Sequence, residues 1–190
     1  QLSQDDPRRS NVRILNPLTE EQSVMRTSLV PGMLEVVSRN LAYRSDDLRL
    51  FELRPVFEVV ENQEQPCEKV NLCAAITGRR EMQGWAQNNE AVDFFDLKGL
   101  VEVVAEQLNI ASFKVEADAE QSYLHPGKSC RIYSGKTLIG VMGEVHPVVQ
   151  DAYDISQPVF LVELDVPAMV ASRKAAASFE AISRFPDVYR

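Results

Sequence analysis

The sequence predicts an α+β fold in which helices flank a largely antiparallel sheet. Strand patterns come mostly as hairpins, with about seven strands and four or five helices in all, which is the order expected of this class. The stretch 23–60 combines a helix with a long strand, and the remaining strands supply its partners. At 190 residues and 45% hydrophobic composition, the chain suits one large domain or two small ones.

The first clear helix is expected over 29–41. Val30, Leu34, Val37 and Leu41 recur at helical spacing and would form its apolar face. Ser28 is the predicted N-cap. Pro31 falls in the first turn, where a missing N–H does no harm.

A long strand is expected over 48–60, because apolar and polar residues alternate there. Phe51, Leu53, Phe57 and Val59 point one way and are the predicted core face. The opposite face carries Glu52, Arg54 and Glu58, and two interpretations of it stay open. It either lines a functional cleft or is a half-solvated face with a cross-strand ion pair.

This strand is expected to pair antiparallel with 70–77, through an acidic loop over 61–68. A polar loop over 79–90 would place Trp85 on the core. A second helix begins at Asp93, and its predicted apolar stripe comprises Leu97, Leu100, Val101, Val104 and Leu108. Glu90, Asp93 and Asp96 near its start could bind a metal, although carboxylates in a first turn are what ordinary helices select.

Shorter elements complete the prediction. The half of the chain after this helix contributes strands at 112–117, 129–133, 137–145 and 159–164, a turn at His125-Pro126-Gly127, and helices starting at Pro147 and Pro167. Gly140 and Gly143 interrupt one strand, which indicates a bulge or a close backbone approach. Near the N-terminus we expect a frayed segment over 1–11, a short strand over 12–15 and a helical turn over 19–24.

Composition excludes several classes of function. The formal net charge is −8, and residues 61–125 hold five Lys/Arg against twelve Asp/Glu, which is unsuited to wrapping a polyphosphate backbone. No apolar run has the length of a membrane span, and the N-terminus has no signal-peptide form. Cys67, Cys73 and Cys130 lack a C-x-x-C pair, so we expect buried free thiols in a reducing cytoplasm.

No catalytic constellation stands out from the residues. His125 and His146 each precede a proline, which favours a role in turns over a role in a nucleophilic triad. The G-x-x-G at 140–143 lacks the flanking pattern of a phosphate loop. Glu52 and Glu58 lie about 20 Å apart on an extended strand at ~3.3 Å per residue, too far to act on one bond.

Five segments, in order, resemble the β subunit of bacterial phenylalanyl-tRNA synthetase. They are NPLTEEQSVMRTSLVPGMLEVVSRNL at 16–41, LRLFEL-x-x-VFE at 48–58, DFFDLKGLVE at 93–102, LHPGKSCRIYSGKTLIGVMGEVHP at 124–147 and ISRFP at 182–186. One departure is Arg54-Pro55, where related sequences usually have Gly-Arg. Pro55 removes a strand N–H, so we expect a local bulge or a sheet edge there.

The resemblance implies a degenerate class II aminoacyl-tRNA synthetase core, the catalytic-like module. This module would span 12–174, and 175–190 would be a linker and the start of a ferredoxin-like anticodon-binding domain. The family implies a cytoplasmic heterotetramer of two α and two β subunits. Its α subunit charges tRNA(Phe) with ATP and Mg²⁺, and its editing pocket and β-subunit magnesium site belong to domains upstream of residue 1.

The resemblance also implies that this segment is non-catalytic, with no catalytic, cofactor-binding or metal-binding residue. Stretch 26–57 looks like a degenerate second signature motif, followed by Glu58, Glu61, Glu64 and Glu68 where an active subunit places arginines. The third-motif position, 158–170, has Glu163 and Asp165 and no Gly or Arg. Fixed cations are what phosphoryl oxygens need in a partly dry cleft. Two alternatives remain: a residual small-molecule or enzymatic site on the Glu52/Arg54/Glu58 face, and an unrelated folded scaffold.

Overall fold

The computed structural model describes residues 6–17, 19, 23–60, 65–81, 84 and 89–174. Within them the chain forms a 3-10 helix η1 (Pro7–Arg9), four α-helices and six strands. In order these are α1 (Val30–Ala42), β1 (Leu48–Glu58), β2 (Cys67–Thr77), α2 (Phe94–Gln107), β3 (Phe113–Ala117), β4 (Leu124–Ser134), β5 (Thr137–Val145), α3 (Pro147–Ala152), β6 (Val159–Asp165) and α4 (Val166–Ala171).

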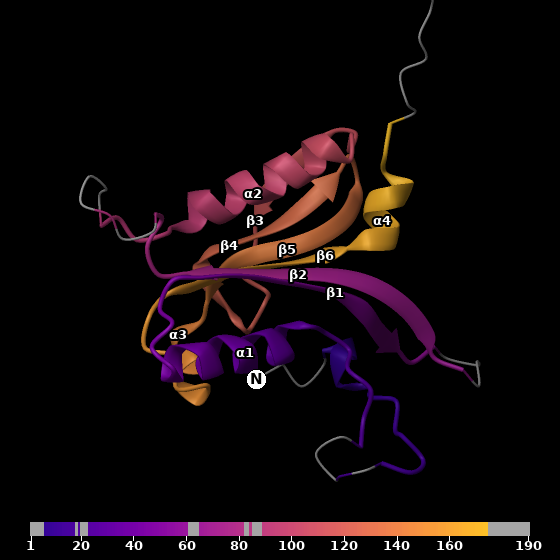
Figure 1. The fold of residues 1–190 in the computed structure, drawn as a ribbon. Coiled ribbons are helices and arrows are strands. Elements are labelled where there is room, and N and C mark those ends of the chain that lie inside the picture. Colours follow the sequence, from indigo (N-terminus) through magenta and orange to yellow (C-terminus); the bar gives the residue numbers. More distant parts are fainter. Residues whose placement is uncertain are drawn as a thin grey trace, which may run out of the picture.

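The six strands make one sheet in the order β1-β2-β6-β5-β4-β3, and every neighbouring pair is antiparallel. Helices α1 and α3 lie on one face, and α2 and α4 lie on the other (Figure 1). The predicted α+β class and the antiparallel sheet flanked by helices are confirmed. We expected about seven strands. The difference is the stretch 12–15, which forms an isolated bridge, Arg13 opposite Val24, rather than a strand.

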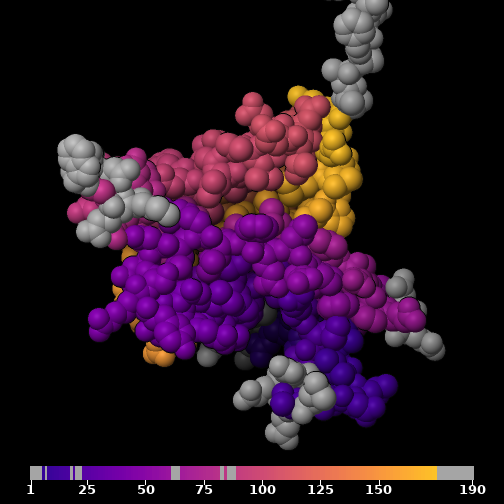
Figure 2. Space-filling model, in the orientation of Figure 1, coloured from indigo at the N-terminus to yellow at the C-terminus, as the bar shows by residue number. Residues whose placement is uncertain are grey.

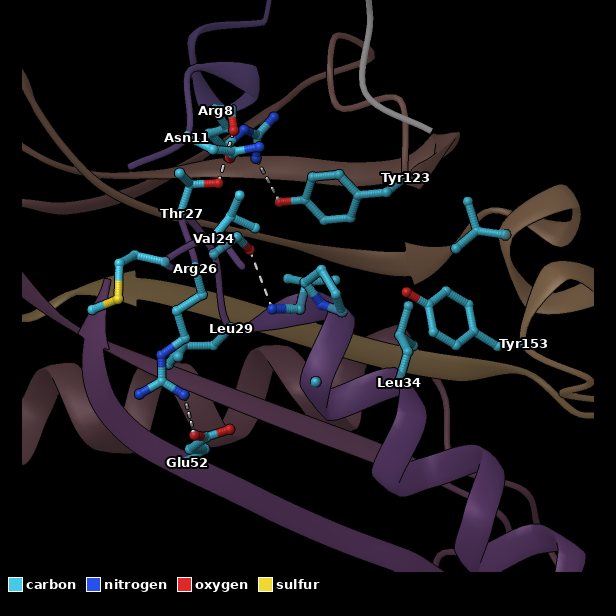
Figure 3. A pocket seen from close by; sticks show the side chains of 16 residues that line it. Arg8, Asn11, Val24, Arg26, Thr27, Leu29, Leu34, Glu52, Tyr123 and Tyr153 are labelled. Carbon is cyan, nitrogen blue, oxygen red and sulfur yellow. Dashed lines mark hydrogen bonds and ion pairs between the residues drawn. The ribbon is translucent and has the colours of Figure 1, made fainter. Parts of the chain in front are cut away.

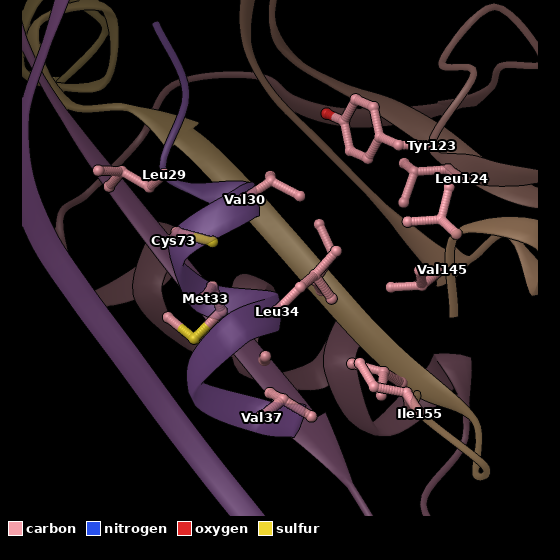
Figure 4. Packing of buried hydrophobic residues seen from close by; sticks show 14 of the residues in the cluster. Leu29, Val30, Met33, Leu34, Val37, Cys73, Tyr123, Leu124, Val145 and Ile155 are labelled. Atoms are coloured by element: carbon pink, nitrogen blue, oxygen red, sulfur yellow. The ribbon is translucent and has the colours of Figure 1, made fainter. Parts of the chain in front are cut away.

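Two apolar clusters hold the layers together. The first joins α1 and α3 to the sheet through residues that include Leu34, Val37, Cys73 and Val145 (Figure 4). The second joins α2 and α4 to the other face, through residues that include Leu97, Ile132 and Met169. Burial on both faces explains why β6, the third strand of the sheet, is apolar along almost its whole length.

The predicted core face of β1 is wrong. Phe51 is 77% exposed and Leu53 is 53% exposed, whereas Val56 on the opposite face is fully buried. The cause is the edge position of β1. Helix α1 packs on β1, whereas α2 packs on β5 and β6 and α4 packs on β2, β5 and β6. In the described part of the chain, no helix therefore covers the Phe51 face of β1.

Two other predictions about sheet geometry are borne out. Pro55 lies on the edge strand, and the β1–β2 register runs through it without a bulge. Gly140 and Gly143 mark close approaches: a Cβ at Gly140 would lie 2.6 Å from the Glu163 carbonyl oxygen, and one at Gly143 would lie 2.7 Å from that of Lys128. The β4–β5 register also shifts near both glycines.

The helix ends differ in how far local sequence determines them. The predicted start of α2 at Asp93 is confirmed, and Asp93 is the N-cap, in a capping box with Asp96 that was not predicted. Pro31 lies in the first turn of α1, as predicted. Ser28 is not the N-cap of α1. That position is Leu29, which makes no side-chain cap of its own. In the stripe predicted for α2, Leu100 is 49% exposed and Ala105 is buried instead.

Several further expectations meet the structure in part. His125 and Gly127 lie inside β4 rather than in a free turn, although the β4–β5 register is irregular there. Cys73 and Cys130 are buried as predicted, but Cys67 is exposed. The predictions for Trp85, for residues 20–22 of the helical turn expected over 19–24, and for 175–190 lie outside the described residues.

Candidate functional site

A cavity of about 450 Å³ opens at the N-terminal end of α1. Its walls come from the segment before α1, the first turns of α1, strand β1 and two tyrosines (Figure 3). In Figure 2 the N-terminal segment, in indigo, lies below the purple α1–β1 region, with a recess between them. Glu52, from the strand face for which the sequence left a functional cleft open, lines this cavity, so we take it as the candidate functional site.

Two arginines reach the cavity, and each is paired with a carboxylate. Arg26 Nη1 lies 3.0 Å from Glu52 Oε1, and Arg26 Nε donates to the Pro55 carbonyl at 2.8 Å. Arg8 forms a two-pronged contact with Asp6, with N–O distances of 2.6 and 2.9 Å. That hydrogen bond lowers the pKa of the Asp6 carboxyl and raises the pKa of the Arg8 guanidinium. The cavity therefore holds cations whose charge is already balanced.

Two tyrosines from distant parts of the chain complete the cavity. Tyr123 is almost fully buried, and its hydroxyl lies 3.5 Å from Arg8 Nη1. Burial raises the pKa of the Tyr123 phenol, so the group stays a neutral hydrogen-bonding partner. Tyr153 follows α3, and burial, then the nearby Glu35 carboxylate, raises the pKa of its phenol as well.

The structure divides the predicted Glu52/Arg54/Glu58 face. Only Glu52 lines the cavity. Arg54 is exposed, and Glu58 pairs with Lys69 at 3.4 Å on the neighbouring strand. The cross-strand ion pair that we considered for this face is therefore present at Glu58, and the cleft is present at Glu52.

Glu163 joins the central strand to the start of α1. Its side chain is buried, and it accepts hydrogen bonds from Leu29 N and Ser28 Oγ, both at 2.9 Å, and from Asn71 Nδ2 at 3.2 Å. Ser28 Oγ in turn accepts from Val30 N at 3.1 Å. A carboxylate from β6 thus accepts the backbone N–H at the start of α1, and the N-cap residue needs no side-chain cap of its own.

The carboxylates that could have formed a metal site gather around an arginine. Arg80 contacts Glu90 at 2.6 Å, Asp96 at 2.9 Å and Asp93 at 3.4 Å. No cluster of three or more metal-binding side chains occurs among the residues that the structure describes. Asp93 and Asp96 cap α2, and all three carboxylates pair with Arg80.

The two histidines lie side by side, with ring centroids 6.4 Å apart. His125 Nδ1 accepts from Gly127 N at 3.1 Å, and His146 Nδ1 accepts from Val148 N at 3.2 Å. His146 thereby caps α3. Both imidazoles shape the local backbone, as their X-Pro context predicts.

Comparison with known proteins decides the family. The family model described as "Phenylalanyl tRNA synthetase beta chain CLM domain" matches residues 1–166. The chain belongs to this family. The resemblance to β subunits noted from five sequence segments is thereby confirmed.

Curated relatives agree with this CLM assignment. The chain is 53% identical over 190 residues to the phenylalanine–tRNA ligase beta subunit of Syntrophotalea carbinolica, and 46% identical over 189 residues to that of Geobacter sulfurreducens. It is 36% identical over 180 residues to the Bacillus subtilis beta subunit. These matches span 100%, 100% and 95% of this chain, in the same order. They span only 24%, 24% and 22% of the relatives, so the chain corresponds to about a quarter of their length.

Solved structures share the fold of this chain. Pyrrolysyl-tRNA synthetase from Desulfitobacterium hafniense superposes with a TM-score of 0.65 at 15% identity, covering 89% of this chain and 55% of that one. At such low identity the match speaks for the fold alone. No helix in the described part of the chain is both long and apolar enough to cross a membrane.

Sequence reasoning did not identify several polar residues of the cavity wall. Glu52 was singled out, but Arg8, Tyr123 and Tyr153 were not. Arg8 and Tyr123 are 115 positions apart, and nothing in a single sequence connects them. The one sequence signal for this part of the wall was the GEVHP segment at 143–147, because the short helix α3 that begins there ends at Tyr153.

Proposed function

We propose that this CLM domain is a non-catalytic structural and interaction module of a phenylalanine–tRNA ligase β subunit. It would support the α subunit in the ATP-dependent charging of tRNA(Phe), within a cytoplasmic heterotetramer of two α and two β subunits. The Mg²⁺ and ATP of that reaction would be held by the parent complex and not by this segment.

One observation carries the proposal: the charge of the cavity is balanced internally. A nucleotide site needs fixed cations facing the place where phosphoryl oxygens lie. Here Arg26 is paired with Glu52 and Arg8 with Asp6, so a triphosphate at either guanidinium would meet the repulsion of a neighbouring carboxylate. The third-motif strand contributes Glu163, a buried carboxylate occupied by the start of α1.

Calorimetry tests the absence of nucleotide binding. We expect no heat of binding when ATP with Mg²⁺, or a non-hydrolysable phenylalanyl-adenylate analogue, is titrated into the protein. Micromolar affinity for either ligand would overturn the non-catalytic part of the proposal.

Co-purification tests the interaction part. A tagged α subunit co-expressed with this chain is expected to retain it through size-exclusion chromatography. Failure of the chain to co-elute, while the intact β subunit does so, would show that the main contacts lie in other parts of the β subunit.

A further inference from the structure

We propose that the cavity at the start of α1 is a binding site for an uncharged small molecule with an apolar body and a primary-amide head. The inference stands independently of the proposed function, since it depends only on the shape and polar groups of this cavity. A volume of about 450 Å³ falls within the range of small-molecule sites.

The apolar body would lie against a wall that the core already holds in place. Val30, Leu34 and Val149 line the cavity and are buried members of the first apolar cluster. Pro31, in the first turn of α1, lies beside them. Because these side chains are fixed by packing, binding costs little ordering of the protein.

The polar head would face the Arg26–Glu52 pair. Each group uses one terminal atom in their mutual contact, Arg26 Nη1 and Glu52 Oε1. Among the described residues, the second Nη of Arg26 and the second carboxylate oxygen of Glu52 have no hydrogen-bond partner. They lie on opposite sides of the contact and add one free donor and one free acceptor to the cavity wall (Figure 3). A primary amide can bind to either of them, because it has both a carbonyl and an NH₂ group.

Charge balance selects against ionic heads. The pair has no net charge, so an anion gains the attraction of Arg26 but meets the repulsion of Glu52, and a cation meets the reverse. The Tyr153 hydroxyl is a neutral group that has no hydrogen-bond partner among the described residues and points toward Leu34 (Figure 3). It can bind a second polar atom of the ligand.

Methyl NMR of the intact parent subunit tests the proposal locally. Met25 lines the cavity, whereas Met142 and Met169 lie in the cluster on the opposite face of the sheet. The Met25 methyl resonance is assigned by its loss in Met25→Leu. Titration with benzamide is expected to shift it saturably, with a Kd on the order of 1 mM for so small a ligand, and to leave the other two resonances unmoved.

Two glycines give a matched pair of variants. A side chain at Gly32, which lines the cavity, meets no atom within 4 Å of its Cβ, and the same holds for Gly99 in α2. Gly32→Leu is therefore expected to keep the fold, to fill the cavity and to weaken benzamide binding by about tenfold or more. Gly99→Leu is the control, with binding unchanged.

Ligand charge gives the second arm. Benzoate and benzylamine carry a charged group on the same ring, and both are expected to bind the unmutated protein about tenfold more weakly than benzamide. In Glu52→Gln the order of benzamide and benzoate is expected to reverse, because Arg26 loses its counter-charge. The proposal is overturned if the Met25 resonance does not move at 20-fold the expected Kd, if Gly32→Leu binds as the parent does, or if benzoate binds the parent more tightly than benzamide.

Discussion

Removing the Glu163 carboxylate should destabilise the fold more than any nearby surface change. In Glu163→Ala, three donors lose their acceptor: Leu29 N, Ser28 Oγ and Asn71 Nδ2. At about 1 kcal/mol for each hydrogen bond, the free energy of unfolding should fall by about 3 kcal/mol. For a chain of this size that corresponds to a fall in Tm of roughly 6–12 °C.

Glu163→Gln is the matched control. The amide keeps an acceptor oxygen for Leu29 N, and its NH₂ group can donate to Ser28 Oγ, whose hydroxyl rotates. We expect a loss of about 1 kcal/mol, mainly the charge component of these bonds. Urea unfolding followed by circular dichroism measures both variants.

A double-mutant cycle with Ser28→Ala then isolates one contact. The coupling energy between Ser28 and Glu163 is expected to be about 1 kcal/mol. Our reasoning is refuted if Glu163→Ala unfolds within about 0.5 kcal/mol of the unmutated protein, since the carboxylate would then not hold the start of α1. Equal large losses in the alanine and glutamine variants would contradict the expectation that the glutamine amide keeps most of these hydrogen bonds.

Two further predictions test burial. Val56→Ala should lower the free energy of unfolding by about 2 kcal/mol, whereas Phe51→Ala on the exposed face should change it by less than about 0.5 kcal/mol. Equal losses would show that the two faces of β1 are both covered in solution. In thiol titration with a disulfide reagent at pH 8, Cys67 should react at once. The other two thiols should react only on unfolding, because burial raises the pKa of Cys73 far above its usual range and that of Cys130 to about 11. Three fast thiols in the folded protein would contradict this.

Elements with local signals could be predicted from the sequence. The bounds of β5 and the capping box of α2 follow from turn residues and from acidic residues at the right spacing. The burial of β6 follows from the apolar run with which the strand begins. Each of these depends on neighbours within a few positions of the chain, which is the range over which a single sequence is informative.

The burial of β1 and the cavity depend on distant parts of the chain. Both faces of β1 carry apolar residues, so alternation alone cannot tell which face is covered. The outcome is set by where α1, α2 and α4 pack. Likewise Glu163 was noticed as an acidic residue out of place, but its role as the cap of α1 becomes visible only when residues 134 positions apart meet.

The dependence of ATP binding on salt concentration distinguishes this cavity from a site that still binds nucleotides. The Arg26–Glu52 pair is partly exposed and contributes about 0–1 kcal/mol, so pairing alone would not stop a phosphate from displacing Glu52. The displaced carboxylate would still lie close to the new anion, with a repulsion of about 4 kcal/mol at 4 Å and an effective dielectric constant of 20.

A site with excess cations binds anions more tightly as ionic strength falls, since the screening length grows from about 8 Å at 0.15 M to about 30 Å at 0.01 M. The charge of this chain, −8 overall, acts in the opposite direction. We therefore expect ATP binding to stay undetectable by calorimetry across that whole range. ATP affinity that increases as the salt is diluted would mean that free guanidinium groups outnumber the carboxylates around the cavity, against the ion pairs at Arg8 and Arg26.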